Sequence, residues 1–144
     1  LTPEGAPLVL EKSHIKSRAA AKHGEKLTVI GEEILRYFEA YSPEHVVREK
    51  GFSRFAATTQ ALFKTVGVSD VVEYEFGHKQ IAEIAPTSVK KAVTGSGKAS
   101  KDEVAVAVRR LLQIDQADFF ATDDESDAAA VGIAYYIEKG LITI

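Results

Sequence analysis

The chain has 144 residues, a net charge of −3 and neither cysteine nor methionine. This length suits a single domain over residues 1–144, large enough to bury its own core. The absence of cysteine excludes disulfides and thiolate metal sites and fits a reducing cytosol, and no apolar run approaches the ~20 residues of a membrane span. Because the net charge is slightly negative, any surface that binds nucleic acid must be local.

The first part of the chain predicts a turn, a strand and a helix. Thr2 to Gly5 has the proline and glycine of a tight turn, and Pro7–Ile15 has the apolar content of a strand. The polar stretch Lys16–Glu25 is a surface connection that could touch DNA. Apolar residues at helical spacing then predict an amphipathic helix over Glu25–Ala40, which Ser42-Pro43 ends.

The middle of the chain predicts a short strand and a long helix. The strand Glu44–Glu49 ends in a carboxylate, at the place where open α/β sheets present functional groups; a solvated strand end is the ordinary alternative. The helix Ser53–Phe76 is rich in small residues and ends before Gly77. Gly67 inside it costs about 1 kcal/mol relative to alanine, which suggests close packing against another backbone.

The last part predicts a strand and three helices with clear start signals. Gln80–Ala85 is the strand, and Pro86 suits the first position of a helix that continues over Thr87–Thr94 and stops at Gly95. Ser100 with Glu103 forms a capping box for a helix to about Leu112. A second capping box, Thr122 with Glu125, is predicted to start a helix that continues to about Glu138.

Two oppositely charged segments lie close together in this part. Pro86–Lys101 carries four lysines and no acid, and Asp115–Asp127 carries six acids and no base. Lysines can hold a phosphate backbone, and carboxylates can hold the ions that cleave it. A solvated charged loop is the alternative, since charge runs are usually exposed.

Asp124 and Asp127 are three residues apart, so they share a face in the first turn of the last helix. Together with Glu49 they would form a hard oxygen cluster suited to Mg²⁺, or to Mn²⁺ as a substitute. The alternative is that both acids are ordinary caps, since negative charge is favoured at a helix N-terminus.

Neighbouring residues receive structural roles. Ala128, Val131 and Tyr135 would lay the last helix on the sheet, with Asp123 and Glu125 as cap and surface. The four histidines show no ligand spacing and receive no role.

The order of motifs resembles a known family. The run Pro-x-x-Val-Lys-Lys-Ala-Val-x-Gly-x-Gly-x-Ala-x-Lys, a helix and then Asp-x-x-Asp-Ala resembles the C-terminal half of RuvC-type Holliday junction resolvases, and the match extends upstream to about Lys26. The resemblance implies an α/β, RNase H-like fold with a mixed central sheet flanked by helices. It also implies a homodimeric, Mg²⁺-dependent endonuclease of DNA recombination and repair. Such an enzyme would cut four-way DNA junctions in the cytoplasm of a bacterium or a phage-infected host. Forked DNA is a second expected substrate.

The resemblance assigns roles residue by residue. Glu49 matches a catalytic glutamate that ends the family's fourth strand, and the long helix matches one at the homodimer interface. Phe52 matches an aromatic residue that some members wedge into the junction, although a core role is an equal alternative. Implied metal ligands are Glu49, Asp124 and Asp127, with Lys101 as a further catalytic residue; implied DNA contacts are Phe52, Arg54, Lys90, Lys91, Lys98 and Lys101.

One family feature is missing. The family has a fourth carboxylate, an aspartate on its first strand, and no acid in Leu1–Lys12 has that context. Because the chain also starts at Leu1 without a methionine, we expect this strand to precede the sequence. The alternatives are a catalytically inactive junction-binding module and another RNase H-like nuclease. Binding of Mg²⁺ or Mn²⁺ would argue against the first, and cleavage of an RNA–DNA hybrid would favour the second.

Overall fold

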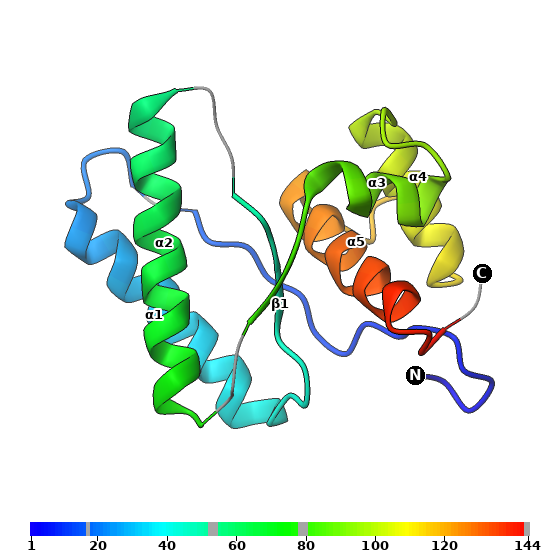
Figure 1. The fold of residues 1–144 in the computed structure, drawn as a ribbon, viewed down its shortest axis with the longest axis horizontal. Helices are drawn as coiled ribbons and strands as arrows, with labels where there is room; N and C mark the ends of the chain where they lie inside the picture. Colours follow the sequence, from blue (N-terminus) through cyan, green and yellow to red (C-terminus); the bar gives the residue numbers. More distant parts are fainter. Residues whose placement is uncertain (17, 52–54, 78–80, 143–144) are drawn as a thin grey trace. The chain divides into compact units, whose positions relative to one another are not determined.

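A computed structural model describes residues 1–144 except 17, 52–54, 78–80 and 143–144 (Figure 1). Every predicted helix is present, with ends within three residues of the predicted ones. Phe52 and Arg54 lie outside the described residues. The order of elements is α1 (His23–Tyr41), β1 (Val47–Glu49), α2 (Ala56–Glu75), β2 (Ala82–Ile84), α3 (Pro86–Thr94), α4 (Lys101–Leu111) and α5 (Asp123–Glu138).

The chain divides into two compact units. The α3–α5 unit comprises Leu1–His14, Val47–Lys50 and Glu83–Ile144, and the α1–α2 unit comprises Ile15–Val46 and Gly51–Ala82. In the described chain, no helix has both the length and the apolar character needed to cross a bilayer.

Helices α1 and α2 pack against each other through small and aromatic residues. A Cβ placed on Gly31 would lie 3.1 Å from the Val68 side chain, so this glycine permits a close approach of the two helices. Phe38 is buried, and the centroid of its ring lies 5.4 Å from the centroid of the Phe76 ring. A Cβ placed on Gly67, by contrast, would meet no described atom within 4 Å beyond its chain neighbours and the backbone of its own helix. Any close packing there would have to come from outside the described chain.

The two strands pair in parallel. The amide of Lys50 donates to the carbonyl of Ile84 at 2.8 Å, and the amide of Ala82 donates to the carbonyl of Val46 at 2.9 Å. Because both residue numbers rise together along the pair, the strands share one direction, as expected when a helix such as α2 connects them.

The predicted strand over Pro7–Ile15 is wrong. The structure assigns no strand between residues 7 and 15, although the preceding turn is confirmed by a 2.9 Å hydrogen bond from the Gly5 amide to the Thr2 carbonyl. An extended peptide becomes a strand only when a neighbour pairs with its backbone. Two of its side chains, Lys12 and His14, bond to Glu125.

The α3–α5 unit follows its predicted start and stop signals. Gly95 ends α3 in a left-handed conformation with φ 82°, and the Ser100–Glu103 capping box is complete, with hydrogen bonds of 3.2 and 2.7 Å. A Cβ on Gly97 would lie 3.2 Å from the Thr87 carbonyl oxygen, so the turn between α3 and α4 favours a glycine there. The apolar core includes Val89, Val93, Val104, Val108, Ala130, Ile133 and Ala134.

Three predictions about α5 are wrong, those for Thr122, Glu125 and Ala128. Thr122 makes no side-chain capping hydrogen bond, and Glu125 is buried rather than on the surface. Ala128 is exposed, while Ala130 and Ala134 are fully buried. Glu125 is buried where Lys12 and His14 of the N-terminal segment bond to it. Ala130 and Ala134 are buried because α5 packs against α3 and α4 as well as β1.

Candidate functional site

A hollow of about 270 Å³ lies in the α3–α5 unit and gathers four predicted site residues. Glu49 enters it from the end of β1, Lys90 from α3, Lys101 from the first residue of α4 and Asp127 from the first turns of α5. These positions are far apart in the sequence, and packing of α5 against β1, α3 and α4 brings them together. The apolar part of the lining is Pro86, Val89, Val104, Ala130 and Val131.

The two carboxylates of this hollow interact unfavourably. The pKa of Glu49 is raised, first because burial disfavours its charged form and next because the Asp127 charge lies nearby; the Lys101 and Lys90 charges oppose the shift. A carboxylate that is desolvated beside a like charge gains from a nearby cation. The geometry therefore favours positive charge between Glu49 and Asp127.

Lys101 already supplies part of that positive charge. Its Nζ lies 3.4 Å from Asp127 Oδ2 and 3.9 Å from Asp123 Oδ2. The charge of Asp127 and its hydrogen bond raise the pKa of Lys101, with smaller contributions from Asp123 and Asp124. Since the lysine side chain is 61% exposed, water weakens these pairs, and its ammonium group remains available to an incoming phosphate.

Three other predicted residues lie outside the hollow. Asp124, Lys91 and Lys98 are exposed and do not line it. Within the described residues, no three acidic or histidine side chains form a ready-made metal site. The structure therefore brings Glu49 and Asp127 together and leaves Asp124 on the adjacent surface.

The chemistry of the lining fits a hard divalent cation. Mg²⁺ commonly takes one or two protein carboxylates and completes its six ligands with water and substrate phosphate. Glu49 and Asp127 provide the two carboxylates, and the hollow provides space beside them. Lys90 and Lys101 line the same hollow, where they could contact a phosphate that shares the cation.

Sequence reasoning missed one polar cluster, which we call the Glu125 clamp: Glu125, Lys12, His14 and the amide of Ala121. Glu125 Oε2 accepts from Lys12 Nζ at 2.8 Å and from the Ala121 amide at 2.9 Å, and Oε1 lies 2.9 Å from His14 Nδ1. These hydrogen bonds, from Lys12 first, then His14 and Ala121, lower the pKa of Glu125 to about 2. Lys12 and His14 precede Glu125 by 113 and 111 residues, so no local pattern could indicate the pairing.

The clamp should make the fold sensitive to acid. A carboxylate whose pKa is lower in the folded chain than its usual 4.5 contributes stability above that value. This contribution is lost as the pH falls from about 4.5 towards 2. We expect the melting temperature to fall over this range and to fall less steeply in Glu125→Gln. Thermal unfolding by circular dichroism from pH 7 to pH 2 measures both; equal slopes for the two proteins would contradict the assignment.

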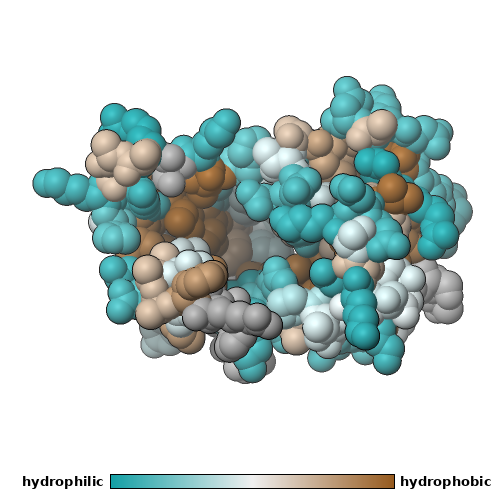
Figure 2. Space-filling model, turned by 90° about the horizontal axis from the view of Figure 1, so that it is seen from above, coloured by the Kyte–Doolittle hydropathy of each residue, from teal (hydrophilic) through white to brown (hydrophobic). Residues whose placement is uncertain are grey.

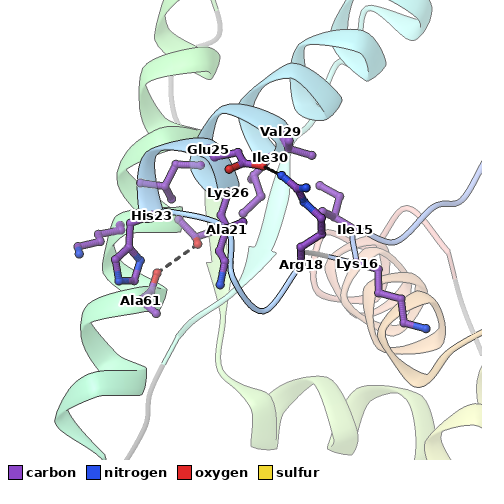
Figure 3. A pocket seen from close by; sticks show the side chains of 13 residues that line it. Ile15, Lys16, Arg18, Ala21, His23, Glu25, Lys26, Val29, Ile30 and Ala61 are labelled. Atoms are coloured by element: carbon purple, nitrogen blue, oxygen red, sulfur yellow. Dashed lines mark hydrogen bonds and ion pairs between the residues drawn. The ribbon is translucent and has the colours of Figure 1, made fainter.

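A second hollow, of about 440 Å³, lies in the α1–α2 unit (Figure 3). Basic side chains, including Lys16, Lys26 and Lys64, surround apolar ones such as Ile30. Its single acidic lining residue, Glu25, pairs with Arg18. The basic stretch Lys16–Glu25 thus borders a hollow that has no pair of carboxylates, so this hollow does not fit the same metal chemistry.

Comparison with known proteins identifies related chains. The family described as "Crossover junction endodeoxyribonuclease RuvC" matches residues 6–135. A protein of that name from Prochlorococcus marinus (strain MIT 9211) is 31% identical over 134 residues, which span 93% of this chain and 83% of the relative. Another from Synechococcus sp. (strain WH7803) is 30% identical over 131 residues, 91% of this chain and 83% of the relative.

Solved structures agree with the sequence relatives. The structure of Thermus thermophilus RuvC superposes with a TM-score of 0.77 at 25% identity, and covers 93% of this chain and 81% of that one. T. thermophilus RuvC in complex with a Holliday junction substrate superposes with a TM-score of 0.82 at 26% identity and the same coverage. The predicted α/β, RNase H-like fold is confirmed by these neighbours.

Proposed function

Because the chain belongs to the RuvC family of crossover junction endodeoxyribonucleases, we propose that it resolves four-way DNA junctions by metal-dependent hydrolysis of phosphodiester bonds. The substrate of the T. thermophilus relative, a Holliday junction, supports this choice of DNA. Forked DNA is a second proposed substrate, which the same assay tests.

We assign the chemistry to the hollow in the α3–α5 unit. Glu49 and Asp127 would hold a divalent cation, Mg²⁺ or Mn²⁺ in its place, and Asp124 is proposed as a further ligand from the same helix turn. When bound, such a cation supplies Lewis acidity at the scissile phosphate. Lys101 and Lys90 would contact the phosphate and stabilise the charge that develops on it.

The remaining DNA-contact residues are assigned by position. Lys91 and Lys98 are exposed on α3 and on the turn that follows it, where they could bind phosphates next to the cut. Phe52 and Arg54 stay proposed junction contacts. Neither Lys91 nor Lys98 lines the hollow.

One observation carries the assignment: Glu49 and Asp127, 78 positions apart by their residue numbers (127 − 49), line one hollow with Lys90 and Lys101. Solvated loop charges would not be gathered in this way. Burial, and next the nearby charge of Asp127, raise the pKa of Glu49, and a cation between the two carboxylates would relieve both effects.

The test is a cleavage assay with labelled DNA. A four-way junction, a fork and a linear duplex are each incubated with the chain, with and without Mg²⁺. We expect metal-dependent cutting of branched DNA and little cutting of the duplex. Tight junction binding with no cutting in Mg²⁺ or Mn²⁺ would favour the junction-binding module instead, and cutting of an RNA–DNA hybrid would favour another RNase H-like nuclease.

We also propose that two copies pair through α2. Its exposed apolar side chains, Phe63, Val71 and Tyr74, lie eight and three residues apart, which places them on one side of the helix. Gly67 lies on the same face and is open towards solvent in the single chain. Apolar colour reaches the surface over the α1–α2 unit, on the left in Figure 2. A helix with apolar residues on several faces is usually buried on several faces, and a two-fold dimer would place two sites on one symmetric junction.

Phe63→Arg should prevent this pairing. The side chain is 63% exposed in the single chain, so the substitution should leave the monomer folded while placing a charge in an apolar interface. We expect a dimer mass for the parent chain and a monomer mass for the variant by light scattering after gel filtration. Val29→Arg, at an exposed apolar position on α1, is the control and should stay dimeric. A monomeric parent chain, or a dimeric Phe63→Arg, would contradict the proposal.

A further inference from the structure

The Glu125 clamp links three parts of the α3–α5 unit at one carboxylate. Lys12 and His14 belong to the N-terminal segment, Ala121 to the α4–α5 connection, and Glu125 to the first turn of α5. Glu125 is 4% exposed, whereas Lys12 and His14 are partly exposed. The carboxylate is therefore the buried centre, and its partners approach from the surface.

The clamp has further support around Lys12. Its Nζ lies 5.1 Å from the centroid of the Phe119 ring and 6.0 Å from that of Phe120. These rings pack edge to face, with centroids 5.0 Å apart. Lys12 thus connects the Glu125 carboxylate with the aromatic pair just before α5, and a cation over aromatic faces is attracted by them.

Glu125 lies between the two acids of the candidate site in sequence but faces elsewhere. At ~100° per residue, its side chain points about 100° from that of Asp124 and about 160° from that of Asp127. Asp127 faces the hollow and Asp124 the adjacent surface, whereas Glu125 faces the N-terminal segment. Because Glu125 bonds to the N-terminal segment on the side of α5 away from Asp127, its bonds limit rotation of this turn about the helix axis.

We propose that Glu125 is a positioning residue of the nuclease site: through Lys12, His14 and the Ala121 amide it holds the first turn of α5 in the rotation that places Asp127 opposite Glu49. This inference rests on the proposed function of the hollow. Functional groups must be held within roughly 0.5 Å and 10–20° of their working geometry. A first helical turn that is free to fray or rotate would not meet that requirement.

The test separates cation binding from folding. Mn²⁺ binding is measured by calorimetry without DNA, and the Mn²⁺ dependence of junction cleavage is measured well below the melting temperature. For Glu125→Gln we expect roughly 10-fold weaker Mn²⁺ binding, as for residues that orient metal ligands. At saturating Mn²⁺ we expect cleavage about 10-fold to 100-fold slower, as for a small misplacement of reacting groups. Junction affinity in EDTA should stay within about twofold, because the buried Glu125 should not touch DNA.

A second variant tests the clamp from its other side. Lys12→Met leaves Glu125 in place and should shift Mn²⁺ binding in the same direction. The double variant should be no worse than Glu125→Gln, because both changes break the same unit. Glu25→Gln, which removes an exposed ion pair with Arg18, is the control and should leave Mn²⁺ binding unchanged.

The outcomes separate this proposal from the proposed function. If Glu125→Gln melts at a lower temperature but binds Mn²⁺ like the parent chain, the positioning role is overturned. If the parent chain binds Mn²⁺ and cuts no DNA, the nuclease function fails, and Mn²⁺ affinity alone still decides whether Glu125 positions Asp127. If the parent chain binds no Mn²⁺, both proposals are overturned.

Discussion

Asp127→Asn is expected to lower metal-dependent junction cleavage by about 10³-fold while leaving junction binding intact. A cation that polarises a phosphoryl oxygen contributes several kcal/mol of transition-state stabilisation, and about 4 kcal/mol corresponds to 10³-fold in rate. Asparagine keeps the size of the side chain but removes the charge that faces Glu49. Single-turnover cleavage of a labelled four-way junction, with the dissociation constant measured in EDTA, gives both quantities.

The same experiment includes two matched changes. Glu49→Gln should lose activity to a similar extent, because it removes the other carboxylate of the hollow. Asp118→Asn removes an exposed acid of the same acidic segment that does not line the hollow and should cut like the parent chain. Full activity in Asp127→Asn would refute the assignment of the hollow, even if another part of the chain proved to be a nuclease.

Asp124→Asn addresses the third proposed ligand. The structure places Asp124 on the surface beside the hollow, where its charge acts on Lys101. If Asp124 binds the cation once DNA is present, its variant should resemble Asp127→Asn. If it only places negative charge at the helix N-terminus, the loss should be limited to stability, about 0.5 kcal/mol.

Val108→Asp should unfold the α3–α5 unit. Val108 is 0% exposed in the core of that unit, so an aspartate there would be buried without a partner. Burying such a charge costs on the order of 5 kcal/mol or more, which is comparable to the total stability of a typical domain, ~5–15 kcal/mol. Urea unfolding followed by circular dichroism measures the loss.

The neighbouring valine on α4 provides the control for this prediction. Val106 is 56% exposed, and Val106→Asp places the same charge on the same helix, where water can solvate it. We expect a change within about 0.5 kcal/mol. Similar losses for the two variants would mean that helix propensity, rather than burial of the core face, governs the stability of α4.

Local rules were sufficient for most of the helices. The spacing of apolar residues predicts α1, and the Ser100–Glu103 pair and Gly95 mark the ends of α4 and α3 where the structure has them. These features depend on residues three or four positions apart, so they are visible in the sequence. The prediction that Glu49 and Asp127 share a site depended on the resemblance of ordered motifs to a family. No local spacing rule relates the end of β1 to the start of α5, because the two lie far apart in the sequence.

Features that depend on distant partners could not be read in this way. Pro7–Ile15 has strand composition, but a strand forms only where a neighbour pairs with its backbone, and none is assigned in the described part of this segment. Glu125 fits the pattern of a capping residue, yet a capping rule considers only residues within one helical turn, while Lys12 and His14 reach it from the other end of the chain. The hydrogen-bond donors of a carboxylate such as Glu125 are therefore set by the packing of the whole chain and not by its neighbours in sequence. The sequence therefore limits which residues can act, and the packing of α5 against α3, α4 and β1 selects which acid meets Glu49 and which is buried.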